Sequence, residues 1–242
     1  METLLSVREL KLPSGGLLQV FLASFDSSRF EQSAFAAAGI PCPASVARSV
    51  RKRQAEFFFG RLVARAALCD CGAPIVDVPI GNAGEPVWPE HFVGSISHTN
   101  AVAVAVVGEQ AYHVGLGIDI ERVVSPESEI ALRAIAINPD ELDFLRSVDG
   151  PLELRELVTL VFSAKESLYK GAFSTVQRFF DFHAARVSAI DVACGVVTLT
   201  LEEDLNVLFP RKRRCEIGYV QIDPMTILTV FEAREKVELS GL

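Results

Sequence analysis

The chain has 242 residues, of which 50% are apolar and 22% charged, so it is neither a disordered tail nor a disulfide-stapled mini-protein. That length fits one large domain or two smaller halves, and either can bury a core without a metal or a cross-link. The formal net charge is −8, from 23 Lys and Arg against 31 Asp and Glu, which disfavours a protein that binds duplex DNA. We therefore expect no nucleic acid partner.

The cysteines and the apolar runs indicate a cytoplasmic protein. The five cysteines form no C-x-x-C pair, and Cys69 and Cys71 are too close for the usual pair of zinc ligands. The N-terminus lacks a basic segment followed by a long apolar run, so no secretory signal is expected. The longest aliphatic run, 101–107, is far shorter than the ~20 residues of a membrane span, so no span is expected either.

In chain order, the first half is predicted to contain one long helix among strands. Pro43 suits the first turn of this helix, and Gly72 lies just past its end. Gly and Pro residues make the stretch after it irregular. The expected elements are a strand at 17–25, the helix at 43–67, an irregular stretch at 74–89, and strands at 92–97 and 101–107.

The second half is predicted to repeat this mixture of helices and antiparallel strands. Asn138 and Glu141 form a capping box that starts a helix. The other expected elements are a helix at 151–173 and strands at 113–121, 184–190, 196–201, 215–222 and 226–231. Together the two halves predict an α+β fold, with the halves meeting between residues 108 and 121.

The first chemical motif is a pair of carboxylates on the strand at 115–121. Asp119 and Glu121 alternate with Ile118 and Ile120, so the acids share one face and the isoleucines face a core. The two acidic Cα atoms would lie roughly 6.6 Å apart. Such a pair either is solvated at a strand end or shares a cation.

The second motif lies on the helix at 151–173. Glu166 and Lys170 are spaced i, i+4 and share a face, which alone predicts only an ordinary surface ion pair. If the helix reaches the strand, Glu166 adds a third hard oxygen ligand, a set that suits Mg²⁺ with a bound phosphate. Lys170 would then bind that phosphate, as phosphoryl transfer requires.

The third motif is GSISHT at 94–99. Ser97 and His98 end a strand near a turn, where side chains can reach a ligand. The sequence has no recognisable spacing of a Ser/His/Asp triad, so a hydrolytic serine is unsupported, and His98 is expected to donate to a phosphate. The other histidines, His91, His113 and His183, are interpreted as structural.

The fourth motif is a basic cluster at 52–65. Arg61 and Arg65 share a helix face, and Arg53 lies roughly 80° from Arg61 around the helix axis. A solvated face explains such a cluster, but Arg is also the preferred fork for phosphate. A further basic run, Arg211 to Arg214, is expected at an exposed hairpin tip and suggests no function.

Five segments in this order resemble the phosphopantetheinyl transferases of the surfactin-synthetase-activating and enterobactin types. They are KRQAEFFFGR (52–61), GEPVWP (84–89), GSISHT (94–99), GIDIE (117–121) and FSAKESLYK (162–170), and the resemblance spans about residues 45 to 175. GIDIE alone is a weak signal, but GIDIE followed about forty residues later by FSAKESLYK is a strong one.

The resemblance implies a monomer of two similar halves related by a pseudo-twofold axis, divided as 1–112 and 113–242, with coenzyme A and Mg²⁺ between them. It implies transfer of 4′-phosphopantetheine from coenzyme A to a serine of an apo acyl or peptidyl carrier protein. The second product is adenosine 3′,5′-bisphosphate. The pathway left open is that of a siderophore or other non-ribosomal peptide, a polyketide or a fatty acid.

The resemblance also implies a role for each motif residue. The residues that would hold Mg²⁺ on the pyrophosphate are Asp119, Glu121 and Glu166, and Lys170 would neutralise pyrophosphate charge. The residues that would contact coenzyme A are Arg53, Arg61, Ser97 and His98, with His98 near the 3′-phosphate and the backbone of 80–83 beside the adenine. Glu166 is the expected general base.

One departure and two rival functions accompany this interpretation. Many relatives carry Lys or Arg in or just before the segment that matches 81–86, whereas this chain has Glu85 and no base there. A contact to the nucleotide phosphate is therefore either lost or supplied by Arg53 and Arg61. The rivals are a metal-dependent phosphoester hydrolase and a non-catalytic module that binds coenzyme A or a carrier.

Overall fold

The chain forms two antiparallel sheets, and the computed structural model describes residues 4–74 and 77–234. The first sheet has the strand order β1-β2-β4-β3 and the second the order β5-β9-β8-β7-β6. The first sheet consists of β1 (Leu4–Lys11), β2 (Leu17–Ser24), β3 (Phe92–His98) and β4 (Val102–Glu109). The second consists of β5 (Gly115–Arg122), β6 (Ala185–Asp191), β7 (Val196–Leu201), β8 (Arg214–Asp223) and β9 (Thr226–Ala233).

Helices flank these sheets on their outer faces. In the first half they are α1 (Ser33–Ala38), α2 (Ala44–Ala47) and α3 (Arg51–Asp70). In the second half they are α4 (Pro126–Ala136), α5 (Pro139–Arg146) and α6 (Leu154–Val176). Short 3₁₀ turns at Ser27–Arg29 and Phe182–Ala184 complete the described elements.

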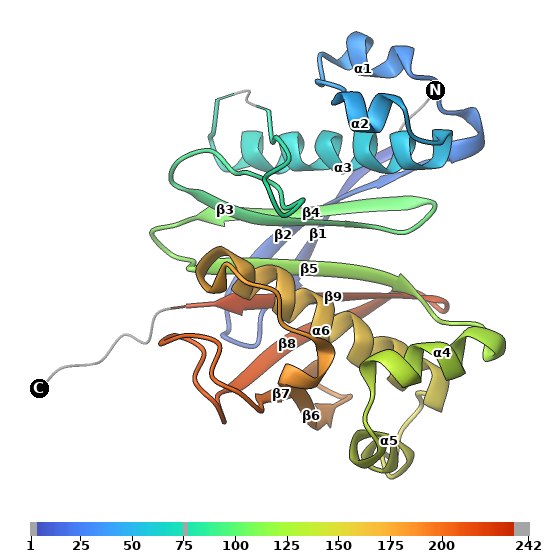
Figure 1. The fold of residues 1–242 in the computed structure, drawn as a ribbon, viewed down its shortest axis with the longest axis vertical. Coiled ribbons are helices and arrows are strands. Elements are labelled where there is room, and N and C mark those ends of the chain that lie inside the picture. The colour runs from blue at the N-terminus through green and yellow to red at the C-terminus, as the bar shows by residue number, and fades with distance from the viewer. Residues whose placement is uncertain (1–3, 75–76, 235–242) are drawn as a thin grey trace, which may run out of the picture.

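The molecule is layered as helix, sheet, sheet, helix (Figure 1). One apolar cluster packs α3 against the first sheet and contains Phe58, Phe59 and Ala105. A second cluster joins the two sheets and contains Val20 and Val106 from one sheet and Ile118, Ile120 and Leu228 from the other. A third packs α6 against the second sheet. The burial of Ile118 and Ile120 between the sheets confirms the alternation predicted for this strand.

Most sequence expectations are confirmed, and the α+β fold in two halves is among them. The nine strands in the described part of the chain include all eight expected ones, and α6 corresponds to the helix expected at 151–173. Helix α5 begins at the predicted capping box of Asn138 and Glu141. The sequence patterns do not predict β1, α1 or α4. All five cysteines are unpaired.

The prediction of one continuous helix over 43–67 is wrong, because α2 ends at Ala47 and α3 begins at Arg51. The Ser49 hydroxyl donates to Val46 O at 2.7 Å, and Val50 has extended backbone angles. The Gln54 side chain donates to Ala47 O and Ser49 O, both at 3.0 Å. Side chains therefore satisfy the backbone carbonyls at the break, which is how a helix end is tolerated in a partly buried position.

Two glycines let α6 lie directly on β5. A Cβ atom added at Gly117 would lie 1.8 Å from Ser167 O, and one added at Gly171 would lie 2.9 Å from Gly117 N. No other residue type fits such a close approach of two backbones. This contact brings the middle of α6 to the end of β5 that carries the acidic motif.

None of the described helices is long and apolar enough to span a bilayer.

Candidate active site between the sheets

Asp119 lies at the centre of the candidate site, where β5 of the second sheet passes β3 of the first. Asp119 is only 2% exposed. Oδ1 accepts hydrogen bonds from Lys170 Nζ at 2.6 Å and from Ser97 Oγ at 2.8 Å. Lys170 Nζ also donates to Ser97 Oγ at 3.0 Å. Residues from β3, β5 and α6 therefore meet at one carboxylate.

This meeting answers the question that sequence spacing left open, because the helix does reach the strand. The partner predicted for Lys170 at i−4 was Glu166, yet the lysine pairs with Asp119 instead. The Lys170 side chain is 26% exposed and the Asp119 side chain 3%, so the pair has one accessible and one buried member. The accessible lysine is available to an anionic ligand.

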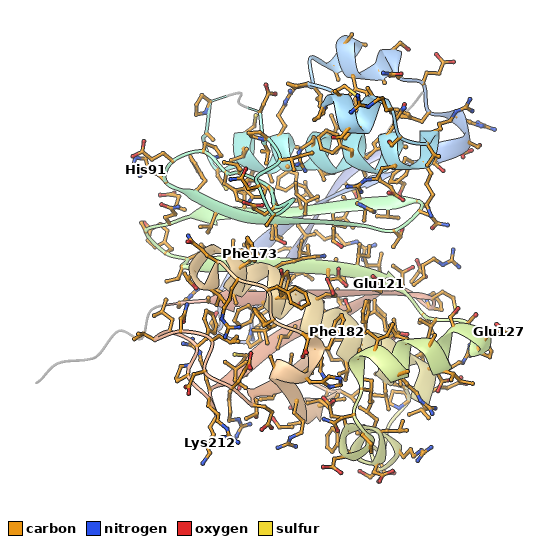
Figure 2. All side chains as sticks on the ribbon, viewed as in Figure 1. His91, Glu121, Glu127, Phe173, Phe182 and Lys212 are labelled. Carbon is orange, nitrogen blue, oxygen red and sulfur yellow. The ribbon has the colours of Figure 1, made fainter. Side chains whose placement is uncertain are left out.

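Glu121 and Glu166 lie within electrostatic range of Asp119, and Figure 2 shows Glu121 on the side of β5 next to α6. Burial, reinforced by Asp119 and Glu166 and opposed by Lys170, raises the pKa of Glu121 to about 8. Burial also raises the pKa of Glu166, opposed by Lys170 and reinforced by Asp119. The three acids thus form one mutually repelling cluster.

His98 and Arg53 meet beside this cluster, at the end of β3. Arg53 Nη1 donates to His98 Nε2 at 3.1 Å. Because an arginine only donates, this His98 nitrogen accepts and the ring is neutral. Burial lowers the pKa of His98, and Arg53 and Lys170 lower it further against the opposing effect of Glu56. Arg53 is therefore the charged member of this pair.

Glu56 organises the basic cluster and was not singled out from the sequence. Its carboxylate lies 3.9 Å from Lys52 Nζ, 3.5 Å from Arg53 Nη1 and 3.9 Å from His98 Nε2. The Glu56 side chain is 11% exposed, whereas the side chains of Lys52 and Arg53 are more than half exposed. Its position at i+3 and i+4 from two bases was the signal available in the sequence.

Arg61 and Arg65 share a helix face, as predicted, but have different surroundings. Arg65 donates to Ala38 O at 2.7 Å and to Gly39 O at 2.8 Å, so its guanidinium anchors the end of α1. Arg61 stacks on the Phe57 ring at 4.5 Å, and its buried Nε has no hydrogen-bond partner. Burial lowers the pKa of Arg61 to about 10, with Arg53 adding to the effect.

Arg61 lines a cavity of about 440 Å³ that also borders Ile80. A buried polar nitrogen without a hydrogen bond costs free energy, whereas a solvated surface base has no such cost. Arg61 belongs to the first kind. The alternative of a merely solvated face therefore does not describe Arg61, although it does describe the exposed Lys52.

Glu85, the residue that stands where many relatives have a base, is used by its own loop. Its Oε2 accepts from Ala83 N at 2.8 Å, and the backbone of Gly81 donates to Glu85 O at 2.7 Å. Ile80 and Pro86 close the loop with a β-bridge. These contacts hold the loop in one conformation, in which it borders two cavities. Glu85 gives the loop no positive charge.

Two further cavities lie on either side of α6. One, of about 330 Å³, lies between the loop of Glu85 and the helix residues Tyr169, Lys170 and Phe173. The other, of about 130 Å³, is bordered by Glu166, Tyr169 and the aromatic residues that follow α6. Figure 2 shows one of these, Phe182, close to α6. Both cavities are largely apolar and open next to the charged residues.

Lys165, the first lysine of the motif, is not in the site. Its side chain is 2% exposed and pairs with Glu141 at 2.8 Å, while Nζ donates to Ala136 O at 2.8 Å. Glu141 in turn accepts from Val187 N at 2.8 Å. This buried pair joins α4, α5, α6 and β6, whereas the sequence pattern indicates for Glu141 only a role as a helix cap.

No group of three or more His, Cys, Asp and Glu side chains in 4–74 and 77–234 is arranged closely enough to hold a metal ion. The oxygens of Asp119, Glu121 and Glu166 nevertheless have the hard-donor chemistry that Mg²⁺ prefers. Lys170 already supplies a cation to Asp119 in this arrangement. The donor set therefore fits the expected metal in kind, and this structure does not gather the oxygens to ligand distances.

The basic run at 211–214 is remote from this cluster. Lys212 lies at the far edge of the second half from Glu121 (Figure 2). Arg213 stacks on the Phe209 ring at 4.8 Å, which stabilises the loop before β8. The run lies at the end of the connection between β7 and β8, and Arg214 is the first residue of β8.

Fold and site together describe an α+β protein with basic and acidic groups gathered where its two sheets meet. Two family models match the chain and agree with this description. Residues 43–108 match the 4′-phosphopantetheinyl transferase N-terminal domain, and residues 115–211 match the 4′-phosphopantetheinyl transferase superfamily.

Curated relatives carry corresponding names. Enterobactin synthase component D of Salmonella typhi is 34% identical over 173 residues, which cover 72% of this chain and 70% of the relative. The same component of Escherichia coli O157:H7 is 38% identical over 144 residues, covering 59% and 66%. The 4′-phosphopantetheinyl transferase PptT of Mycobacterium tuberculosis is 35% identical over 144 residues, covering 59% and 61%.

The chain belongs to the 4′-phosphopantetheinyl transferase superfamily. The resemblance stated from its motifs is thereby confirmed, and so is the expectation that it is an enzyme of the transferase class. This membership favours phosphopantetheine transfer over the hydrolase and the non-catalytic binding module.

Proposed function

We propose that this enzyme transfers 4′-phosphopantetheine from coenzyme A to a serine of an apo carrier protein in a Mg²⁺-dependent reaction. The observation that carries the proposal is the junction of Asp119, Lys170 and Ser97 between the two sheets. A buried carboxylate and an accessible ammonium side by side suit a diphosphate and its accompanying cation. The halves that meet there are proposed to be 1–112 and 113–242.

Asp119, Glu121 and Glu166 are the residues that would hold Mg²⁺. When bound, the metal would neutralise diphosphate charge and make adenosine 3′,5′-bisphosphate a better leaving group. Lys170 would form an ion pair with an oxygen of the same diphosphate. Its Nζ donates to Asp119 and Ser97, and the side chain is 26% exposed, so an anionic ligand can reach it.

Arg53 and Arg61 are proposed to bind the other phosphate of coenzyme A. Arg53 is half exposed and holds the neutral His98 ring, which places a guanidinium and an imidazole together beside the junction. Arg61 lines its cavity, and its buried Nε has no hydrogen-bond partner. The backbone of 80–83 borders two cavities and is proposed to flank the adenine. These residues would compensate for the base that the loop of Glu85 lacks.

Glu166 is proposed as the general base for the incoming serine. The serine oxygen attacks the β-phosphorus, the bond from that phosphorus to the bridging oxygen breaks, and the serine proton passes to the carboxylate. Burial of Glu166 raises its pKa, which makes the carboxylate a stronger proton acceptor once it is ionised. A carboxylate has two oxygens, so one can face a cation while the other accepts the proton.

The carrier protein and the pathway follow from the names of relatives alone. Two of them are components of enterobactin synthase, which makes a carrier of siderophore assembly the first candidate substrate. Carriers of other non-ribosomal peptide, polyketide or fatty acid pathways are further candidates. We also propose that the enzyme acts as a monomer in the cytoplasm.

The proposal is tested by incubating the full chain with apo-carriers of each type, coenzyme A and Mg²⁺, and measuring intact carrier masses. The expected result is that the carrier gains the mass of one phosphopantetheine. No gain is expected when Mg²⁺ is chelated before the reaction starts. Asp119→Asn should slow transfer by about 100-fold or more, because one charge at the diphosphate is removed.

Two outcomes would contradict it. Cleaved coenzyme A with an unmodified carrier would indicate that water replaces the serine. Binding of coenzyme A without any turnover on every carrier tested would indicate a binding module.

A further inference from the structure

A chain of hydroxyl groups lies behind Asp119, on the side away from Lys170. Ser163 Oγ donates to Asp119 Oδ2 at 2.8 Å. Ser163 Oγ and Thr229 Oγ1 are 2.9 Å apart, and Thr229 Oγ1 also lies 2.9 Å from Ser163 O. Both Ser163 and Thr229 are completely buried.

The order of donors in this chain follows from counting protons. An ionised carboxylate accepts only, so the single hydroxyl proton of Ser163 must point to Asp119. Ser163 Oγ can then only accept from Thr229, whose proton is shared between the hydroxyl and the carbonyl of Ser163. The hydrogen bonds therefore run from Thr229 through Ser163 to Asp119.

Three different elements hold this arrangement in place. Thr229 of β9 is the direct cross-strand partner of Asp119 on β5. Ser163 comes from α6, one turn before the helix meets Gly117. The Asp119 carboxylate thus has Oδ2 tied to the helix, which leaves Oδ1 facing Ser97 and Lys170.

We propose that Ser163, backed by Thr229, is a positioning residue that fixes the orientation of the Asp119 carboxylate for coenzyme A and its cation. The inference rests on the proposed function, because it concerns the same junction. Of the four lone pairs of the carboxylate, three accept hydrogen bonds here, so one on Oδ2 stays open to a cation. Without Ser163, the carboxylate can rotate and present either oxygen.

The chain offers a matched control one turn further along α6. Ser167 is also completely buried, but its hydroxyl donates to Ala164 O of its own helix at 3.0 Å. Ser163→Ala and Ser167→Ala therefore remove the same atom from the same helix at equal burial. Only the first removes a hydrogen bond to Asp119.

The test measures coenzyme A binding in the presence of Mg²⁺ by calorimetry, together with kcat and KM for transfer, on the full chain. Ser163→Ala should weaken binding and lower kcat/KM by about 10- to 100-fold, the usual effect of losing a group that orients a ligating residue. Ser167→Ala should change each by less than about threefold, within the ordinary scatter of such measurements. Equal effects of the two variants would overturn the proposal.

A second pair of variants decides the matter if Ser163→Ala does not fold. Thr229→Val keeps the shape but removes the hydroxyl, whereas Thr229→Ser keeps the hydroxyl. Thr229→Val should lose binding and kcat/KM, and Thr229→Ser should retain both; equal behaviour would overturn the proposal. The wild-type chain reports on the proposed function separately, and if it transfers no phosphopantetheine, the inference falls with that function.

Discussion

Two arginines that look equivalent in sequence have separate tasks at the scale of single residues. The Arg65 guanidinium donates hydrogen bonds to the carbonyls of Ala38 and Gly39. Arg61 keeps an unpartnered nitrogen beside a cavity. Charge-assisted hydrogen bonds to a phosphate are among the stronger polar contacts, so the free arginine has more to offer a ligand.

Arg61→Ala should therefore raise KM for coenzyme A by about 10- to 100-fold, the equivalent of one lost charge-assisted hydrogen bond, with little loss of stability. Arg65 lines the same cavity, but its guanidinium is held by backbone carbonyls, so Arg65→Ala should lower the urea midpoint and change KM much less than Arg61→Ala does. Steady-state kinetics and urea titration measure both. Equal KM values in Arg61→Ala and the wild type would remove Arg61 from the site.

At the scale of elements, the contact between β5 and α6 decides whether the site exists. Gly117 allows the strand backbone to touch the helix backbone, and that contact sets where Lys170 lies relative to Asp119. Any side chain at this position must push the helix outward. Overpacking of this kind affects both stability and the alignment of the two elements.

Gly117→Ala should destabilise the fold by about 1–3 kcal/mol and lower kcat together with it. Gly39→Ala is a suitable control, because it strains a positive φ at the end of α1 but has nothing within 4 Å. The control should lower stability without changing kcat. Calorimetric melting and kcat measurements decide, and an unchanged kcat in Gly117→Ala would contradict the account.

The buried ion pair of Lys165 and Glu141 also holds several elements of the second half together. Lys165→Met should cost about 3–5 kcal/mol in the free energy of unfolding, because it leaves the Glu141 charge buried without its partner. Urea unfolding monitored by circular dichroism measures this loss. A loss below about 1 kcal/mol, the size of an exposed pair, would show that the pair is not the anchor described.

The sequence could predict what depends on neighbours in the chain, and less of what depends on contacts across it. Strand alternation placed Ile118 and Ile120 in a core, and the spacing of the motifs assembled the candidate residues. Ser163 forms hydrogen bonds with Asp119 and Thr229, which lie 44 and 66 positions away in the sequence, so no local pattern reveals them. The break at Ser49 depends on the side chain of Gln54, so helical periodicity alone did not reveal it.

At the scale of the whole molecule, a carboxylate clasp helps hold the two halves together. Glu232 of β9 accepts from Ser14 Oγ in the β1–β2 hairpin at 2.6 Å and from Arg234 Nε at 2.6 Å. His113, between the two sheets in sequence, places Nδ1 2.7 Å from Glu232. Burial alone would raise the pKa of Glu232, but the contacts with His113, Ser14 and Arg234 outweigh it and lower the pKa to about 2.

The clasp predicts a specific loss of stability in acid. Because the pKa of Glu232 is lower in the folded protein than its ordinary value of 4.5, the unfolded chain binds more protons between pH 4.5 and about 2. The stability from Glu232 is therefore full above pH 4.5 and is lost as the pH falls toward 2.

Glu232→Gln should lower the free energy of unfolding at pH 7, and its difference from the wild type should shrink between pH 5 and about 3. Glu9→Gln, on the exposed edge of the same hairpin, should show neither effect. Urea titrations across this pH range measure the difference. A difference that stays constant from pH 7 to 3 would contradict the clasp.

The central claim is that coenzyme A is held by its diphosphate at the junction of β3, β5 and α6. A crystal structure of the full chain with coenzyme A and Mg²⁺ tests it most directly. The account predicts a diphosphate in contact with Lys170 and a metal ion that touches the carboxylate of Asp119. A diphosphate bound elsewhere, with the pair of Asp119 and Lys170 closed and untouched, would contradict it.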